Sequence, residues 1–186
     1  MTTGKPIFWG DVETTGLWPD EEHLLLEFAY IITDAELNPL SDGQYLIRQN
    51  ATQARVLMND FVRRMHEKSG IIETLGTGRE VWAVEAEIIA DIREVCGDVQ
   101  PTFGGNSINL DRNFLHAFMP ELNDQVLSYR NIDVSSLKEL ARRWAPDIAD
   151  AATELKTGAH RALDDIRESI AELRFYRDRR FIGGGQ

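Results

Sequence analysis

The feature that most constrains the fold is an almost entirely apolar stretch near the start of the chain, residues 24–33, with the sequence LLLEFAYIIT. It is too short to cross a membrane as a helix, and its aromatic and β-branched residues are typical of a buried strand. A shorter apolar run, residues 7–12, precedes it, and the turn-forming residues 15–20 separate the two. We therefore predict that the chain begins with two strands of a sheet.

A third strand is expected at residues 44–48, after the turn residues 41–43, which makes a meander of three antiparallel strands. A further short strand is expected at 101–104. Apolar residues recur at helical spacing through most of the remaining chain. Helices are predicted at residues 59–68, 80–96, 110–119, 135–144 and 159–179. Strands first and helices afterwards, with one strand between helices, predict an α/β fold with a mixed β-sheet flanked by α-helices.

Two residues mark the bounds of the predicted helix 135–144. Ser135 is a favoured N-cap type, and Pro146 follows the last residue, where a helix often stops. We therefore predict that Ser135 caps this helix and that Pro146 lies beyond its end.

The length of 186 residues suits one domain, and no internal repeat or linker divides the chain. We expect residues 1–182 to form a single domain and 183–186, with the sequence GGGQ, to form a flexible tail. The lone Cys96 cannot form an internal disulfide, and the start lacks a basic region followed by a long apolar run. These features predict a cytoplasmic protein with no membrane segment.

Acidic residues outnumber basic ones by 31 to 20, which gives a formal net charge of −11. Such a balance disfavours tight, non-specific attachment to long polyanions, which usually needs a basic surface. It remains compatible with a nucleic-acid enzyme whose carboxylates bind metal cations and whose substrate is short. Most of these charges are also explained by a solvated surface.

Two carboxylates stand at the end of the first predicted strand. Asp11 and Glu13 are two residues apart, so on a strand they project from the same face. Their repulsion would be relieved by a hard divalent cation such as Mg²⁺ or Mn²⁺, which prefers carboxylate oxygens. Taken alone, the pair is more typical of a strand end with two solvated acids than of a metal site.

Further candidate residues occur later in the chain. Asp111 could bind a metal or merely favour the first turn of its helix, and His160 could be catalytic or a surface cap. Asp164 and Asp165 could likewise complement a helix N-terminus. Helical spacing favours Asp164, which stands four residues after His160, over Asp165, which stands five residues after it.

The order of these residues resembles a known pattern, that of the DEDD exonucleases whose base is a histidine, in the RNase H-like superfamily. The five residues that match it are Asp11, Glu13, Asp111, His160 and Asp165. The resemblance selects Asp165 over Asp164, which agrees with helical geometry if His160 lies just before the regular helix. Longer segments are similar to the oligoribonuclease family, namely residues 106–108, 111–115, 119–122, 133–144 and 164–173. The similarity spans residues 6–181.

The resemblance implies a fold and a reaction. It implies an RNase H-like mixed β-sheet flanked by α-helices and a metal-dependent 3′-to-5′ exoribonuclease that degrades very short single-stranded RNA, especially dinucleotides, to nucleoside 5′-monophosphates. The four carboxylates would hold two divalent cations, Mg²⁺ or Mn²⁺, roughly 4 Å apart. His160 would act as the general base, since an imidazole titrating near pH ~6.5 can accept a proton around neutrality.

The resemblance also implies how the substrate is selected. Leu17 would wedge between bases and Phe61 would stack on one of them. His66, Ser107 and Arg130 would form a cap on the 5′ phosphate, which measures substrate length. Tyr129 would complete the pocket from the other subunit, so a homodimer is expected.

The sequence departs from the oligoribonuclease pattern at two of these places. Thr14 stands where methionine is usual, and the resulting ETTGL segment is similar to proofreading-type DNA exonucleases. Phe61 stands where tryptophan is expected, which keeps stacking but with a smaller ring. The alternatives are therefore a 3′-to-5′ exonuclease acting on single-stranded DNA ends and a catalytically silent RNase H-like binding module.

Overall fold

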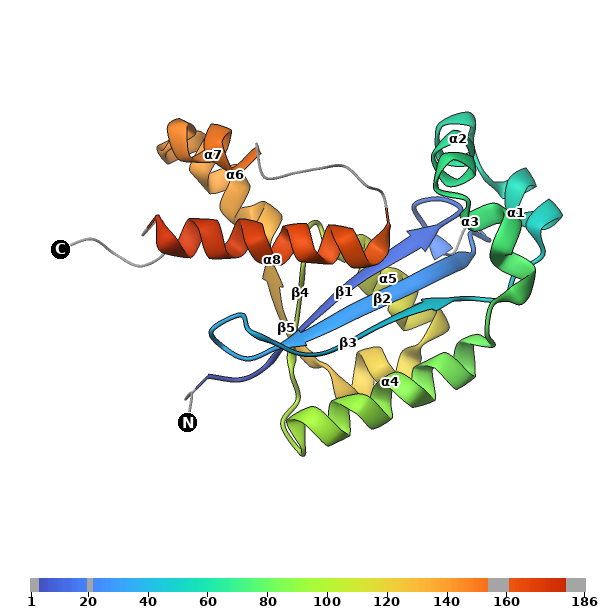
Figure 1. The fold of residues 1–186 in the computed structure, drawn as a ribbon, viewed down its shortest axis with the longest axis horizontal. Coiled ribbons are helices and arrows are strands. Elements are labelled where there is room, and N and C mark those ends of the chain that lie inside the picture. The colour runs from blue at the N-terminus through green and yellow to red at the C-terminus, as the bar shows by residue number, and fades with distance from the viewer. Residues whose placement is uncertain (1–3, 20–21, 154–160, 180–186) are drawn as a thin grey trace.

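The computed structural model describes residues 4–19, 22–153 and 161–179 (Figure 1). A five-stranded sheet, with the strand order β3-β2-β1-β4-β5, forms its centre. The strands are β1 (Ile7–Thr14), β2 (Leu25–Thr33), β3 (Pro39–Leu46), β4 (Thr102–Gly105) and β5 (Ser128–Asp133). β1, β2 and β3 pair antiparallel, whereas β4 runs parallel to β1 and β5 parallel to β4. The predicted mixed sheet and its antiparallel meander are confirmed.

Helices cover both faces of the sheet, with α4 on one side and α8 on the other (Figure 1). The helices are α1 (Ala51–Leu57), α2 (Asp60–Ser69), α3 (Ile71–Thr74), a 3₁₀ turn η2 (Leu75–Thr77), α4 (Val81–Cys96), α5 (Asn109–Phe118), a π-helical turn η3 (Leu122–Val126), α6 (Val134–Trp144), α7 (Pro146–Thr153) and α8 (Ala162–Asp178). None of the described helices is long and apolar enough to cross a membrane.

The strands bury side chains on both faces, and the two sets belong to different cores. Phe8 and Phe28 pack with Ile88 of α4 in a core that also includes α5. Trp9 of the same strand points to the opposite face and packs with Ile170 of α8, in a core shared with α6 and α7. This alternation follows from the period of two along a strand, and it places the odd-numbered residues of β1 on the α8 face.

A third, smaller core lies under α1, α2 and α3 at the end of the sheet where β1 stops, and it includes Leu26 of β2 and Ile72 of α3. The starts of α1 and α2 are capped by Asn50 and Asn59, whose side chains each accept two backbone N–H hydrogen bonds. α2 ends at Gly70, which has a φ of 75° that favours glycine. These caps hold α2 beside the end of β1.

Two local predictions were wrong. The third strand is longer than residues 44–48 because the polar segment from Pro39 pairs along β2 at the sheet edge. Asp133, and not Ser135, caps α6, since its side chain accepts the Ser135 N–H. Pro146 lies beyond the end of α6, as predicted, and it also begins the unpredicted α7, a position that proline tolerates because the first N–H of a helix needs no partner.

Several predicted helices are confirmed, whereas other helices and one strand were not predicted. The helices predicted at 59–68, 80–96 and 110–119 are confirmed to within about two residues at each end. The strand β5 and the helices α1, α3 and α7 were not predicted. The tail predicted at 183–186 lies outside the described residues.

Candidate active site

Three carboxylates meet at the carboxyl end of β1. Asp11 and Glu13 project from the face that α8 covers, and Asp165 comes from the first turn of α8. One oxygen of each residue lies within 4.8 Å of the others. The structure thus brings together three of the four residues predicted to bind metal.

Asp111, the fourth predicted metal ligand, reaches the same strand from the other side. It lies in the first turn of α5, is buried, and accepts a hydrogen bond of 3.1 Å from the backbone N–H of Val12 to its Oδ1 atom. β4 pairs with β1 only as far as Trp9, so α5 can approach the last part of β1 directly. Asp111 is therefore connected to the acidic cluster by its hydrogen bond to β1.

The groups around the cluster do not fully compensate the negative charge of its carboxylates, and the pKa values of these carboxylates are raised. Burial raises the pKa of Asp11 well above its usual range, and the nearby Asp111 and Glu13 carboxylates raise it further. Burial also raises the pKa of Glu13 to about 8, with Asp165 the next cause. Burial raises the pKa of Asp111 to about 7, although the hydrogen bond from Val12 acts in the opposite direction.

This donor set fits a divalent cation. Several carboxylates that are buried near one another favour their neutral forms unless a positive charge joins them. A hard cation such as Mg²⁺ or Mn²⁺ binds carboxylate oxygens and would restore the ionised forms. The described residues therefore match the acidic metal-binding group that was predicted, without indicating which ion is bound.

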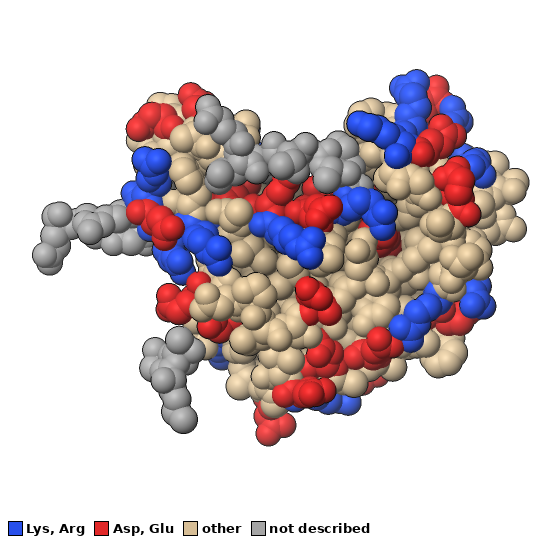
Figure 2. Space-filling model, viewed as in Figure 1, with Lys and Arg blue, Asp and Glu red and all other residues tan. Residues whose placement is uncertain are grey.

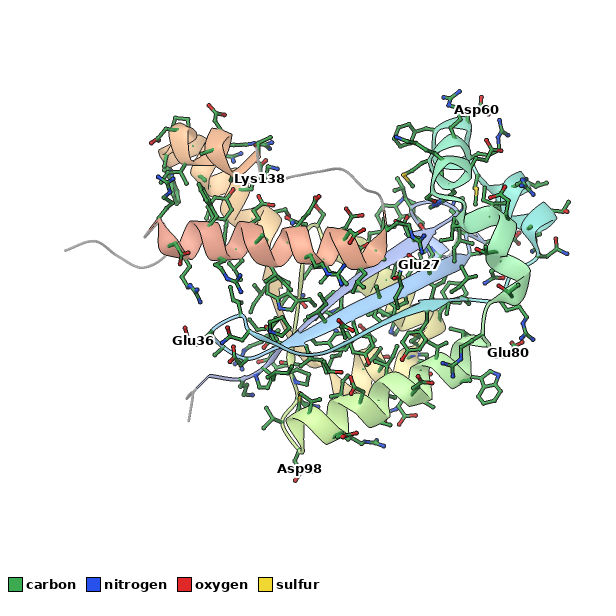
Figure 3. All side chains as sticks on the ribbon, viewed as in Figure 1. Glu27, Glu36, Asp60, Glu80, Asp98 and Lys138 are labelled. Carbon is green, nitrogen blue, oxygen red and sulfur yellow. The ribbon has the colours of Figure 1, made fainter. Side chains whose placement is uncertain are left out.

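A fifth carboxylate, Glu27, lies next to the cluster but has a protein partner. Glu27 is directly opposite Glu13 in the pairing of β1 and β2, is 1% exposed, and lies beside the first turn of α8 (Figure 3). The guanidinium of Arg161 donates to both Glu27 oxygens, at 2.9 and 3.4 Å, and the Gln44 amide donates to one of them at 2.9 Å. Glu27 is thus neutralised by Arg161.

The sequence analysis assigned no role to this ion pair. The signal was the single acid inside the apolar stretch 24–33, because a charge buried in a strand needs a partner. Arg161 also links the pair to the cluster through its backbone, since its carbonyl accepts hydrogen bonds from Asp164 and Asp165 N–H at 2.9 and 3.0 Å. The pair therefore ties the start of α8 to β2.

The choice between Asp164 and Asp165 is decided by the position of the helix. α8 begins at Ala162, with the extended Arg161 before it, and Asp165 faces the cluster. Asp164 pairs with Arg167 at 2.9 Å instead, and about half of its side chain is exposed. His160, the predicted base, lies outside the described residues.

The turn that carries Leu17 is held by hydroxyl groups. Thr14 donates to the carbonyl of Gly16 at 2.7 Å, and the Thr15 hydroxyl accepts the Leu24 N–H at 2.9 Å. A Cβ atom at Gly16 would collide with the ring of His23, so the close approach requires glycine. Leu17, the predicted wedge, stands 61% exposed on this turn.

The two predicted substrate residues of α2 have different surroundings. Phe61, in the first turn, is 70% exposed. His66 is buried, and its Nε2 donates to the Thr14 carbonyl at 2.9 Å, while Nδ1 lies 3.9 Å from a Glu13 oxygen. His66 therefore contacts the end of β1, and its assignment to the phosphate cap stays a prediction.

The other predicted substrate residues lie near β5, the strand at one edge of the sheet. Ser107 is exposed and has a φ of 56°, an uncommon value for a residue with a side chain, and its N–H donates to Asp133 Oδ1 at 3.0 Å. Tyr129 and Arg130 are both exposed, and the guanidinium of Arg130 lies 5.1 Å from the centre of the Tyr129 ring. Their assignment to substrate binding also stays a prediction.

Charged side chains of both signs lie close together on the face shown in Figure 2. Among the described residues on this face, Lys and Arg stand beside acidic groups and form no continuous basic surface. Elsewhere in the described part of the chain, ion pairs such as Arg55 with Glu73 and Arg63 with Asp60 likewise place basic beside acidic groups. Long polyanions usually need a continuous basic surface, and the described residues on the face shown present none.

The mixed sheet and its acidic cluster define the class of protein. A family model described as "RNase_T: Exonuclease" matches residues 8–173. The chain is 44% identical over 177 residues to the oligoribonuclease of Vibrio campbellii, covering 92% of this chain and 93% of the relative. It is 41% identical over 184 residues to that of Tropheryma whipplei, covering 97% and 96%. The chain belongs to the oligoribonucleases within this exonuclease family.

Solved structures with the same fold include two forms of exonuclease I. The Escherichia coli enzyme in complex with a dT13 oligonucleotide superposes with a TM-score of 0.70 at 15% identity, over 95% of this chain and 42% of that chain. The Methylocaldum szegediense enzyme gives a TM-score of 0.63 at 22% identity, over 94% and 41%. This chain thus spans about two fifths of their length, and the likeness confirms the predicted RNase H-like fold.

Proposed function

We propose that this protein is a metal-dependent 3′-to-5′ exoribonuclease that degrades very short single-stranded RNA, dinucleotides above all, to nucleoside 5′-monophosphates. The observation that carries the proposal is the meeting of Asp11, Glu13 and Asp165 within 4.8 Å in a chain of the oligoribonuclease family. Asp111, bonded to the same strand, completes the set.

These four residues would hold two divalent cations, Mg²⁺ or Mn²⁺. Such cations supply Lewis-acid stabilisation of the charge that develops on the phosphate oxygens. The protein supplies a rigid frame for them, because two ligands lie on one strand and the others on helices that pack on opposite faces of the sheet. His160, which precedes Arg161 in the sequence, would accept the proton of the attacking water.

The substrate would lie across the exposed side chains around the cluster. Leu17 and Phe61 offer apolar surface for bases on the side of α2. Base stacking on an aromatic ring contributes about 1–3 kcal/mol. Ser107, Arg130 and His66 would bind the 5′ phosphate, and a second subunit would contribute its own copy of Tyr129.

A preference for short substrates follows from the charge distribution. A long strand would meet the remaining acidic surface of a chain with a net charge of −11, whereas a dinucleotide contacts only the cluster and its surroundings. A cap on the 5′ phosphate would exclude longer strands sterically. These two effects act in the same direction.

The test compares three substrates in Mn²⁺ or Mg²⁺: a 5′-phosphorylated RNA dinucleotide, a longer RNA and single-stranded DNA. We expect the dinucleotide to be cleaved with the highest kcat/KM. Asp165→Asn should abolish cleavage, whereas Asp164→Asn, the matched change one residue earlier, should keep activity within about twofold because Asp164 pairs with Arg167.

The other outcomes of the same assay are equally informative. Faster cleavage of DNA than of either RNA would replace the proposal with a single-strand DNA exonuclease. Absence of any metal-dependent cleavage by the unmodified protein would leave only a binding role. Equal losses in the two aspartate variants would contradict the assigned roles of Asp164 and Asp165.

A further inference from the structure

Strand β5 contains an interruption that places two side chains outside the regular sheet. Thr102 of β4 pairs with Ser128, but the next residue, Phe103, pairs with Asn131. Residues 129–130 therefore have no partner in the ladder and form a bulge. Bulges of this kind redirect side chains and occur often beside functional sites. Here they leave Tyr129 81% exposed.

Arg112 of α5 holds both ends of this bulge with one guanidinium group. Its Nη2 donates to the Ser128 carbonyl at 2.6 Å, on one side of the bulge. Nε and Nη2 donate to Asn131 Oδ1 at 3.1 and 3.0 Å, on the other side. The same side chain thus sets the distance between the residues that flank the bulge.

The remaining contacts of Arg112 fix the guanidinium itself. Nη1 donates to Asn123 Oδ1 at 2.9 Å, and the group lies 4.8 Å from the centre of the Phe103 ring. A planar fork with five donors can satisfy this set, whereas a lysine ammonium on a flexible stem cannot. Inside the bulge, Ser128 Oγ accepts the Arg130 N–H at 3.3 Å, which satisfies a donor that the ladder leaves unpaired.

The position of Arg112 connects the bulge to the acidic cluster. It follows Asp111 directly in α5, and Asp111 is bonded to β1. The first turn of α5 therefore contacts the cluster through Asp111 and the bulge through Arg112. The bulge presents an aromatic ring and a guanidinium in contact with each other, a pair suited to a base and a phosphate.

We propose that Arg112 is a positioning residue for substrate selection, which holds the β5 bulge so that Tyr129 and Arg130 can engage a short nucleotide. This inference rests on the proposed function, and it adds a residue to which the sequence pattern assigned no role. Arg112 acts through the bulge and does not itself contact the reacting phosphate. The effect is the same whether the bulge serves the site of its own subunit or that of a partner.

A purely structural role would have a different signature. If Arg112 only joined α5 to β5, its loss would displace Asp111 and reduce turnover of every phosphodiester. If it positions the bulge, its loss should raise KM for a substrate that the bulge contacts and spare one that is too small to reach it. The two substrates are a 5′-phosphorylated RNA dinucleotide and bis(p-nitrophenyl) phosphate, both assayed in Mn²⁺.

We expect Arg112→Lys to raise KM for the dinucleotide about tenfold, with kcat and the hydrolysis of bis(p-nitrophenyl) phosphate within about twofold of the unmodified protein. Arg93→Lys is the matched control, because Arg93 is two-thirds exposed on α4 and its ion pair with the exposed Glu121 is long, at 3.7 Å. It should change neither substrate. Parallel losses on both substrates with Arg112→Lys, or an unchanged KM, would overturn the inference.

A combined variant tests the route of the effect. If Arg112 acts through the bulge, adding Arg112→Lys to a protein that carries both Tyr129→Ala and Arg130→Ala should raise KM no further than those two changes do without it. Multiplied effects would contradict the inference. Where Arg112→Lys fails to fold by circular dichroism, Asn131→Ala removes one acceptor of the same guanidinium and should give the same selective rise in KM.

The proposed function and this inference fail in distinguishable ways. The proposed function fails if the unmodified protein does not prefer the dinucleotide to longer RNA. The inference fails if the unmodified protein shows that preference and the Arg112 variants keep it.

Discussion

The carboxylates of the cluster at the end of β1 are buried or half-buried between packed elements, whereas most side chains proposed to select the substrate stand exposed on a turn, a helix start and a bulge. Glu13 and Asp111 are at most 7% exposed, but Leu17, Phe61 and Tyr129 are at least 61% exposed. The first group is held by the cores of the fold. The second is held by local devices, such as the Thr14 and Thr15 hydroxyls and the Arg112 guanidinium.

The difference separates two kinds of functional requirement. Like charges held together in a buried site destabilise the fold unless a cation joins them, so the surrounding structure must enforce their positions. Exposed apolar groups cost little stability and can change without affecting the cluster. Chemistry and substrate choice should therefore respond separately to substitution.

The largest effect is expected from a change inside the cluster. Glu13→Gln should lower kcat for the dinucleotide by about a thousandfold, because it removes a proposed metal ligand. It should also raise the melting temperature of the metal-free protein at pH 8, since burial and then the nearby carboxylates, which raise the pKa of Glu13 to about 8, disfavour its ionised form in the folded state. Steady-state kinetics and thermal unfolding in EDTA would measure both.

The control for that variant is Glu36→Gln, the same change at an exposed residue in the turn between β2 and β3, labelled in Figure 3. It should leave both kcat and the melting temperature nearly unchanged. If the Glu13→Gln protein is less stable than the unmodified protein without metal, repulsion between the carboxylates does not destabilise the metal-free fold.

A smaller effect is expected at the exposed surface. Phe61→Ala should raise KM for the dinucleotide about tenfold with little change in kcat, because it removes one stacking platform. Phe61→Trp should lower KM a few-fold, because the larger ring offers more stacking area. Neither variant should change thermal stability by more than about 0.5 kcal/mol. A fall in kcat for Phe61→Ala that exceeds the rise in KM would break the proposed separation of the two regions.

The smallest effect is a dependence of stability on pH. Burial raises the pKa of Glu13 to about 8 and that of Asp111 to about 7, so the folded state holds more protons than the unfolded state between their ordinary values and these. The free energy of unfolding of the metal-free protein should therefore fall as pH rises through this range. Burial lowers the pKa of His66, which acts in the opposite direction but only below its ordinary value.

The measurement is thermal unfolding in EDTA at pH 7 and pH 8.5, both above the ordinary pKa of His66. We expect the melting temperature to fall by a few degrees at the higher pH, since 1 kcal/mol corresponds to about 2–4 °C for a domain of this size. Saturating Mn²⁺ should reduce the fall, since bound cations favour the ionised carboxylates at both values. An equal or higher melting temperature at pH 8.5 without metal would contradict the raised pKa values.

Much of the fold and of the cluster was predictable because the information is local. Continuous apolar runs rich in aromatic and β-branched residues determine β1 and β2, and a spacing of two places Asp11 and Glu13 on one face. The order of five residues along the chain sufficed to predict the family. Helix starts were harder, as Asp133 and Pro146 show, because several residue types can occupy the same positions at a helix end.

The sequence by itself determined four of the five strands, the main helices and the identity of the acidic residues, since these depend on periodicity and residue type. The resemblance to a known pattern selected Asp165 over Asp164, but only the tertiary structure gave the reason, because the residue that faces the cluster depends on where α8 begins. Tertiary structure alone decided that Glu27 pairs with Arg161, 134 residues away, and that Arg112 shapes the bulge in β5. These contacts join segments that no local pattern connects, and only packing brings them within hydrogen-bonding distance.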